Sequence, residues 1–322
     1  MGNEVVWLDF EKPVAELERK IDELRRLSQD GNIKIAEELQ QLEAKLDEVK
    51  HHVYSNLTPW QRVKLARHPK RPYALDYIKL MLTDFIEFHG DRGFADDKAI
   101  VAGPAKLDGT AIMIIAQQKG KDTKENIRRN FGMMHPEGYR KALRLMRQAE
   151  KFSMPVFCII DTPGAFPGIG AEERGISEAI AVNLREMASL KTPIVAVVIG
   201  EGGSGGALGI GVANIVVMLE NAYYSVISPE GAAAILWRDA AKAPQAAEAL
   251  KITAQHLLNF GVIDEIVPEP LGGAHRDYET TAAELKKVVK KYFSQLSSLP
   301  IDQLLEQRYQ KFRNMGKFTE NQ

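Results

Sequence analysis

The residues whose spacing suggests chemistry are the glycines of one turn, at positions 201–211. Six of these eleven residues are glycine, and an apolar, β-branched run precedes them. Glycine lets a backbone approach a ligand closely. A short apolar helix follows the turn, so the N–H groups at its start, above all those of Gly205 and Gly206, could hold an anion. A carbonyl oxygen that gains negative charge during a reaction needs such donors.

Two other interpretations of this turn stay open. Its glycines could serve only to pack the short helix closely against the sheet. The pattern Gly-x-Gly-x-x-Gly at 200–205 also fits a dinucleotide-binding fingerprint, with Glu220 at the end of the next strand as the ribose ligand. A P-loop is not supported, because no Lys-Ser or Lys-Thr pair follows the glycines.

A serine nucleophile is a further alternative, because residues 202–206 contain Gly-x-Ser-x-Gly around Ser204. An esterase would need a base, and His275 is the only plausible histidine. No metal site is expected in this chain. His51 and His52 are adjacent on a predicted helix and point apart, and Cys158, in a buried apolar run, is the only cysteine.

A second special loop, at 161–170, includes Gly164 and Ala165 and follows the apolar run 155–160. A predicted helix at 176–190 connects it to the strand that precedes the glycine-rich turn. Both loops should therefore leave the carboxyl ends of neighbouring parallel strands, and we expect them to share one pocket.

A third candidate is the charged segment 119–132, which directly follows a predicted buried strand. Ligand loops attach at such positions in open α/β sheets. Lys119 and Arg128 are therefore candidates for binding a phosphate or carboxylate group. A solvated charged face is the alternative interpretation.

The elements that must position these residues indicate an α/β fold. Apolar stripes predict a helical hairpin at 10–52, broken at Asp30–Asn32, and a helix from Leu75 to His89. Two strands at 99–103 and 110–116 should form a hairpin around Asp108-Gly109. We expect Glu230 to cap the helix that follows it, with a place in the pocket wall as the alternative. An amphipathic helix should run from Thr281 to a polar C-terminal tail.

Composition limits the function classes. The 322 residues suggest about two domains, with one large α/β domain as the alternative. A net charge of −1 gives no electrostatic footprint for nucleic acid or an anionic membrane. No apolar run approaches the ~20 residues of a spanning helix, and the first ten residues lack the features of a signal peptide. An intracellular location is expected.

Several long strings then resemble a known family. The two backbone-rich loops look like the crotonase (ClpP-like) superfamily, and the strings resemble the carboxyltransferase α subunits of bacterial-type acetyl-CoA carboxylases. The resemblance covers roughly residues 8 to 315. The matching stretches are 65–69, 119–132, 161–168, 171–175, 199–208, 225–231 and 268–275, together with the N-terminal helical hairpin.

The resemblance implies a superhelical β-β-α crotonase fold carrying the helical hairpin at 1–55, a carboxyltransferase domain at 56–295 and a helical tail at 296–322. It implies transfer of a carboxyl group from carboxybiotin, held on a separate biotin carboxyl carrier protein, to acetyl-CoA, forming malonyl-CoA for fatty-acid synthesis. The implied partners also include biotin carboxylase and a β subunit with a four-cysteine zinc ribbon, in an α2β2 assembly. The implied location is the cytoplasm, or a plastid stroma if the protein is organellar.

The resemblance also assigns roles to residues. The N–H groups of Gly205 and Gly206 would hold the ureido oxygen of biotin, which would explain the lack of a dedicated side-chain base. Substrate binding would fall to Gly164, Ala165, Gly203, Lys119 and Arg128. We expect Gly206→Val to abolish transfer while leaving the assembly intact. A non-catalytic scaffold, whose glycine loops only pack, predicts damage to folding first.

Overall fold

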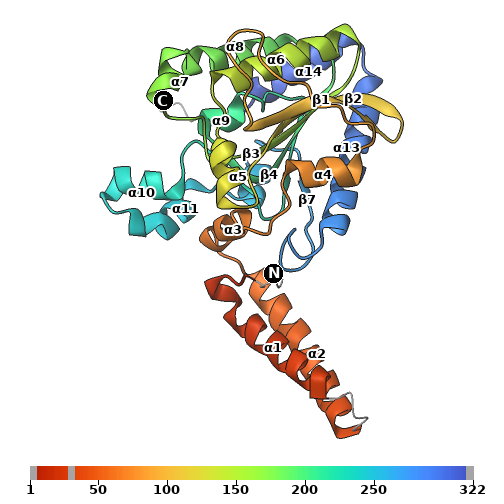
Figure 1. The fold of residues 1–322 in the computed structure, drawn as a ribbon, viewed down its shortest axis with the longest axis vertical. Coiled ribbons are helices and arrows are strands. Elements are labelled where there is room, and N and C mark those ends of the chain that lie inside the picture. Colours follow the sequence, from red (N-terminus) through yellow and green to blue (C-terminus); the bar gives the residue numbers. More distant parts are fainter. Residues whose placement is uncertain (1–5, 28–32, 317–322) are drawn as a thin grey trace, which may run out of the picture.

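The structure of the chain is a computed structural model that describes residues 6–27 and 33–316. The helix breaker expected at Asp30–Asn32 lies outside the described residues. One mixed sheet forms the centre, with helices on both sides (Figure 1). The α/β class predicted from the alternation of apolar strands and amphipathic helices is confirmed.

The described residues form one seven-stranded sheet in the order β1-β2-β3-β4-β5-β7, and β6 pairs with β4. β1 and β2 form the predicted antiparallel hairpin, with Leu107 opposite Thr110, and every other pairing is parallel. Both β3 and β4 are buried along their whole length, as their continuous apolar runs predict. The strands are β1 (Ile100–Leu107), β2 (Thr110–Gln117), β3 (Val156–Thr162), β4 (Ile194–Gly203), β5 (Ile215–Leu219), β6 (Tyr223–Ser225) and β7 (Glu265–Val267).

The helices cover both sides of this sheet. In Figure 1, α6, α8 and α14 lie above it, and α4 and α13 lie on the other side. The helices are α1 (Lys12–Leu27), α2 (Ile33–Ser55), α3 (Pro59–Ala66), α4 (Ala74–Met81), α5 (Thr123–Arg128), α6 (Pro136–Lys151), α7 (Ile169–Glu173), α8 (Ile176–Ser189), α9 (Ser204–Leu208), α10 (Pro229–Trp237), α11 (Ala243–Leu250), α12 (Ala254–Asn259), α13 (Tyr278–Ser297) and α14 (Ile301–Arg313), with short 3-10 turns η1 (Asp9–Glu11), η3 (Asn130–Gly132) and η4 (Ala240–Lys242).

The predicted helical hairpin is present as α1 and α2, which project from the body (Figure 1). Val14, Ile21 and Leu46 are buried between the two helices. At its base, the Tyr54 hydroxyl donates a hydrogen bond of 2.6 Å to Glu11. The hairpin is thus fixed where it meets the body.

The helix predicted from Leu75 to His89 is wrong beyond Met81. Leu82 is extended, and Asp84 has a left-handed φ of 53°. The chain then runs along the edge of β1, where the N–H of Ile86 donates to Pro104 and that of Phe88 donates to Ala102. The apolar spacing looks helical, but the open edge of β1 offers these N–H groups better partners.

The C-terminal helix α14 is fixed to the body by two buried side chains, Leu304 and Arg308. Arg308 is 1% exposed. Its guanidinium donates to the carbonyls of Met187, Leu190 and Thr192 and to Oδ1 of Asn214. Burial lowers the pKa of Arg308 to about 10. The domain boundaries at 55 and 295 stay a prediction, although α14 is more firmly docked than a tail.

Candidate active site

The two special loops meet at the carboxyl ends of β3 and β4, as predicted. A Cβ placed on Gly206 would lie 2.3 Å from the carbonyl carbon of Gly164. One placed on Gly203 would lie 2.1 Å from the Pro163 oxygen. These distances are far below an ordinary carbon contact, so only glycine permits this approach.

This contact corrects our expectation for Gly206→Val. The new side chain would meet the backbone of the neighbouring loop and not open pocket space. The substitution should therefore disturb packing as well as chemistry. Gly205 is different, because its Cβ would meet only the side chain of Ile180, at 3.4 Å or more.

The start of α9 presents unused hydrogen-bond donors. The N–H groups of Gly205 and Gly206 belong to its first turn, and neither has an acceptor within the described part of the chain. The N–H of Ala165, on the facing loop, likewise has none there. Thr162 fixes this second loop, because its hydroxyl donates to the Gly164 carbonyl at 2.7 Å. The two loops therefore offer backbone donors at their junction.

One buried amide side chain links the two loops from beneath. Nε2 of Gln117, at the end of β2, donates to the Gly206 carbonyl at 2.7 Å. Its Oε1 accepts the N–H of Asp161 at 3.1 Å. Gln117 is 0% exposed, so this amide sets the orientation of the Gly206 peptide. Gln117 is not among the residues predicted from the sequence. It could have been found there, because it is a polar residue at the end of an apolar strand, directly before the segment 119–132.

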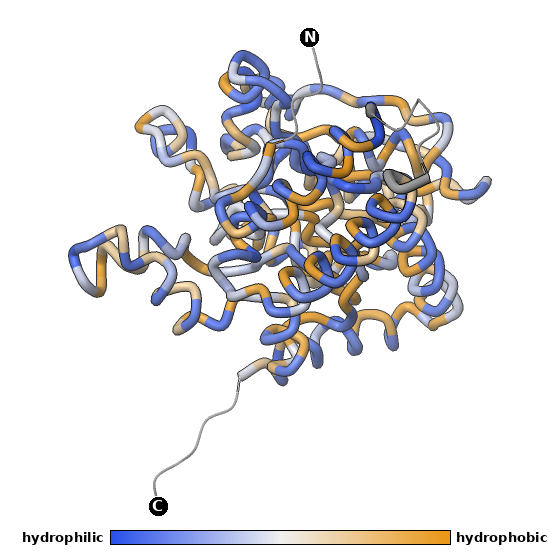
Figure 2. The backbone as a smooth tube through the Cα atoms, turned by 90° about the horizontal axis from the view of Figure 1, so that it is seen from below, coloured by the Kyte–Doolittle hydropathy of each residue, from blue (hydrophilic) through white to orange (hydrophobic). Residues whose placement is uncertain are grey.

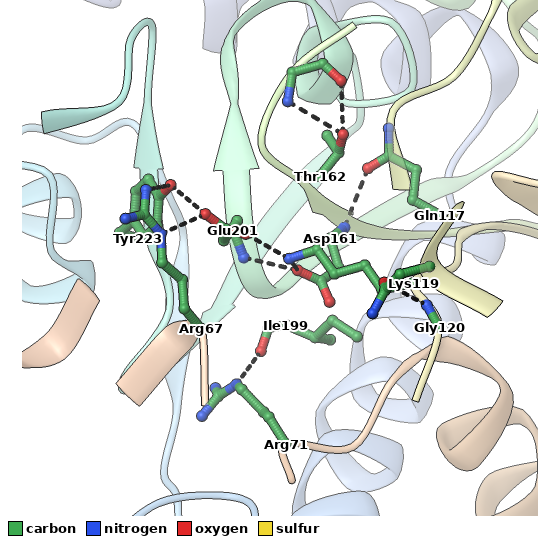
Figure 3. Close-up of polar contacts among 12 residues, drawn as sticks. Arg67, Arg71, Gln117, Lys119, Gly120, Asp161, Thr162, Ile199, Glu201 and Tyr223 are labelled. Atoms are coloured by element: carbon green, nitrogen blue, oxygen red, sulfur yellow. Dashed lines mark hydrogen bonds and ion pairs between the residues drawn. The ribbon is translucent and has the colours of Figure 1, made fainter. Parts of the chain in front are cut away.

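A buried ion cluster lies behind the loops (Figure 3). Nζ of Lys119 bonds to Asp161 at 2.8 Å and to Glu201 at 2.6 Å. Glu201 also accepts hydrogen bonds from Arg67 and Tyr223, both at 2.7 Å. Asp161 further accepts the N–H of Glu201 at 2.9 Å, which joins the ends of β3 and β4.

The cluster fixes the charges of its members. Burial opposes ionisation of Glu201, but Lys119 and Arg67 outweigh it and lower the pKa of Glu201 to about 2. Burial raises the pKa of Asp161, against the opposing effect of Lys119. Burial likewise favours neutral Lys119, yet its two carboxylate partners raise its pKa. Lys119 is therefore held as a cation facing the carboxylates.

The structure separates the two basic candidates. Lys119 is 8% exposed, and its ammonium group forms ion pairs with two buried carboxylates of the protein itself. Arg128 is exposed at the end of α5, without an ion pair to any described residue. The expected capping role of Glu230 is wrong, because Ser228 caps α10 and Glu230 pairs with Arg67.

The geometry gives little support to a serine nucleophile, a dinucleotide site or a metal site. Ser204 has a left-handed φ of 49° at the strand–helix turn, but among the described residues its hydroxyl has no histidine partner. His275 instead stacks on His68, with ring centroids 3.8 Å apart. Glu220 accepts the N–H of Glu269, and the helix after the glycines has only five residues. Among residues 6–27 and 33–316 no group of His, Cys, Asp and Glu could hold a metal ion.

The chemistry that this arrangement supports is stabilisation of an oxyanion by backbone donors. The donors sit on loops that a buried amide and an ion cluster hold in place, so little reorganisation is needed when charge develops. The charged groups at the ends of β3 and β4, Asp161 and Glu201, are both paired with Lys119. A base supplied by the substrate itself fits this arrangement better than a side-chain base.

Comparison with known folds supports the predicted architecture. The structure of transcarboxylase 12S with methylmalonyl-coenzyme A and methylmalonic acid bound is 20% identical, with a TM-score of 0.56, over 70% of this chain and 42% of that chain. A Pseudomonas malonate decarboxylase heterotetramer in complex with coenzyme A gives 18% and 0.54, over 65% of this chain and 84% of that one. The predicted crotonase-type α/β fold is confirmed.

Sequence comparison gives the family. The profile described as acetyl co-enzyme A carboxylase carboxyltransferase-like matches residues 7–316. The acetyl-coenzyme A carboxylase carboxyl transferase subunit alpha of Geobacillus sp. (strain WCH70) is 60% identical over 98% of this chain and 97% of its own length. The protein of the same name from Methylococcus capsulatus is 58% identical, over 98% of both chains. The chain therefore belongs to the acetyl-CoA carboxylase carboxyltransferase-like family.

Proposed function

We propose that this chain is the α subunit of an acetyl-CoA carboxylase carboxyltransferase. It would act with a β subunit to transfer a carboxyl group from carboxybiotin, on a biotin carboxyl carrier protein, to acetyl-CoA, giving malonyl-CoA. Biotin carboxylase would recharge the carrier. The observation that carries the proposal is the junction of two glycine loops with unused backbone donors, in a chain 60% identical to a named α subunit.

The residues present fit a biotin ureido group. Its carbonyl oxygen is an acceptor, and the N–H groups of Gly205 and Gly206 are two adjacent donors without an internal partner. We assign the ureido oxygen to these two donors and the substrate-facing wall to Gly164 and Ala165. The bound group supplies the transferable carboxyl, while the protein binds and orients it.

Two candidates receive supporting roles in this proposal. Gly203 permits the close approach of the loops. Lys119 holds the ends of β3 and β4 together through Asp161 and Glu201. Of our two basic candidates, Arg128, exposed on α5, is the one that could contact an anionic group of a substrate or carrier from solvent.

A partner subunit is supported by apolar surface on the lobe of α10 and α11. This lobe projects from the body and carries hydrophobic positions (Figures 1 and 2). Val226, Ile235 and Leu236 are 74%, 73% and 64% exposed. Large exposed apolar patches mark interaction sites. We propose that the β subunit covers this lobe in an α2β2 assembly, and that any zinc belongs to that subunit.

A cytoplasmic location, or a plastid stroma for an organellar protein, completes the proposal. Of the helices in residues 6–27 and 33–316, none combines the length and hydropathy that a bilayer crossing requires.

The experiment is co-purification with a zinc-ribbon β subunit, followed by a carboxyl-transfer assay in the direction from malonyl-CoA to biotin. We expect activity only when both chains are present. Activity of this chain alone would show that its pocket is complete without β and would point to a stand-alone crotonase-type enzyme. No activity in an assembled complex would refute the proposed reaction.

A further inference from the structure

A basic groove lies between α6 and α8, apart from the candidate active site. Its volume is about 600 Å³, and none of its lining residues comes from the two glycine loops. α6 and α8 lie side by side above the sheet (Figure 1). The turn at residues 90–93, before β1, closes one end. The size is that of pockets that hold small molecules.

Five cationic side chains line this groove, and only some of them are neutralised. Arg140 pairs with Asp91 at 2.8 Å, and Arg147 pairs with Glu186 at 2.8 Å. The other three have no carboxylate within 4.0 Å in the described part of the chain. They are Arg92, Arg144 and Lys151.

Arg144 is the clearest sign of a missing anion. Its Nη2 donates to the carbonyls of His89 and Gly90, at 3.3 and 3.0 Å. Its Nε is buried and has no partner. A buried, unpaired guanidinium N–H is costly, so this side chain would gain a partner by turning toward a ligand in the groove. Burial, and then the neighbouring Arg92, lower the pKa of Arg144, and the opposing effects of Asp91 and Asp96 only partly offset this.

The end of the groove is rigid. Oδ1 of Asp91 accepts the N–H groups of Gly93, Phe94 and Ala95, at 2.8, 2.7 and 3.1 Å. Arg92 sits on this turn with a left-handed φ of 63°. A strained, over-determined turn that holds a cation at a groove is typical of a functional site. A preorganised cation also reduces the entropy lost when a ligand binds.

The groove also offers groups for the rest of a ligand. Asn183, 1% exposed, lines it, and Oδ1 of Asn183 has no donor. Leu143 and Val182 give it an apolar surface. A guanidinium matches phosphate geometry. We propose that this groove binds a small phosphorylated metabolite, through its phosphate groups at Arg92 and Arg144.

The test is calorimetric titration of the full chain with inorganic pyrophosphate and, in parallel, with ADP. We expect saturable binding of pyrophosphate. ADP should bind more tightly, because its nucleoside can contact the apolar surface of Leu143 and Val182. Arg144→Gln should weaken both by about tenfold or more, since one charge-assisted contact is lost. Arg92→Gln, on an exposed side chain, should do the same without affecting folding. Arg19→Gln on α1, which removes the same charge from a side chain that is 72% exposed, is the matched control.

Three outcomes would overturn the proposal. The first is no saturable binding at millimolar pyrophosphate. The second is equal weakening by Arg19→Gln, which would indicate a diffuse charge effect. The third is loss of binding when the chain assembles with its partner subunit, which would make the groove a protein interface. None of these measurements depends on carboxyl transfer, and the first two do not require the proposed partner subunit.

Discussion

Gly206→Ala tests whether the contact between the two loops is needed for chemistry. The new Cβ would lie 2.3 Å from the Gly164 carbon and 2.7 Å from the Ala165 nitrogen. Relief to an ordinary contact needs a shift of about 1 Å, because carbon atoms pack at ~3.5 Å. Both neighbours are backbone atoms, so the loops must separate. We expect the free energy of unfolding to fall by about 1–3 kcal/mol.

The rate should fall much more than the stability. A misplacement of about 1 Å can cost about 100-fold in rate, and losing one oxyanion donor costs a similar factor. Gly205→Ala is the matched control, because its Cβ meets only Ile180 at 3.4 Å and its N–H remains. That variant should stay within a few-fold of the wild-type rate, and its helix should gain up to about 1 kcal/mol.

The assay is carboxyl transfer from malonyl-CoA to biotin by the assembled complex of each variant, with thermal unfolding of the same samples. A Gly206→Ala complex that turns over at the wild-type rate would refute the requirement for the loop contact. A Gly205→Ala complex that is as slow as Gly206→Ala, while equally folded, would show that the pocket does not tolerate a methyl group at either position. The donors would then need a different arrangement.

Three further predictions concern buried ionisable side chains. Burial, and then His68, lower the pKa of His275 to about 3, so native His275 stays neutral while the unfolded chain takes up a proton below about pH 6.5. The contribution of neutral His275 to the free energy of unfolding is therefore fully present above pH 6.5, and it declines by at most about 1.4 kcal/mol per pH unit on acidification. In urea titrations between pH 6.5 and 4, the free energy of unfolding of His275→Phe should depend less on pH than that of the wild type. His51→Gln, on the exposed face of α2, should not change this pH dependence. Lys119→Met should lower the free energy of unfolding by about 3–5 kcal/mol, because it leaves buried Asp161 without a cation and Glu201 with Arg67 alone. An unchanged urea midpoint would contradict the contribution of these ion pairs. Arg308→Met should lower the free energy of unfolding by about 2–4 kcal/mol, because it leaves buried carbonyl groups without their hydrogen-bond donor. Amide hydrogen exchange should then become faster across α14. Protection equal to that of the wild type would show that other contacts hold α14.

The meeting of the two loops could be predicted from the sequence because it follows from topology. Two apolar runs joined by a helix pair as parallel strands, and their carboxyl ends then share one edge. The sequence could not show which glycines tolerate a side chain. Gly205 and Gly206 are adjacent and look alike, yet a Cβ on one meets a flexible methyl group and on the other a backbone. That difference depends on where the neighbouring loop lies.

The ion cluster could not be assigned from one segment alone. Lys119 and Arg128 belong to the same basic stretch, but Asp161 and Glu201, from two other strands, make one of them an interior residue. The sequence does contain a signal, because each of these acids directly follows a run of apolar residues and glycine within its strand. Charges at matching ends of neighbouring buried strands require a shared counter-ion.

Close packing and oxyanion binding were competing interpretations of the glycine-rich turn, and the structure makes them interdependent. The contacts of Gly203 and Gly206 with the facing loop leave no room for a side chain. The same approach brings the start of α9 beside Ala165, so donors from both loops face one junction. Gln117 and the Lys119 cluster fix this junction from below. A side chain that pushes the two loops apart must therefore also move the donors. At Gly206 a substitution should affect packing and chemistry together, whereas at Gly205 a methyl group can be added without moving the facing loop.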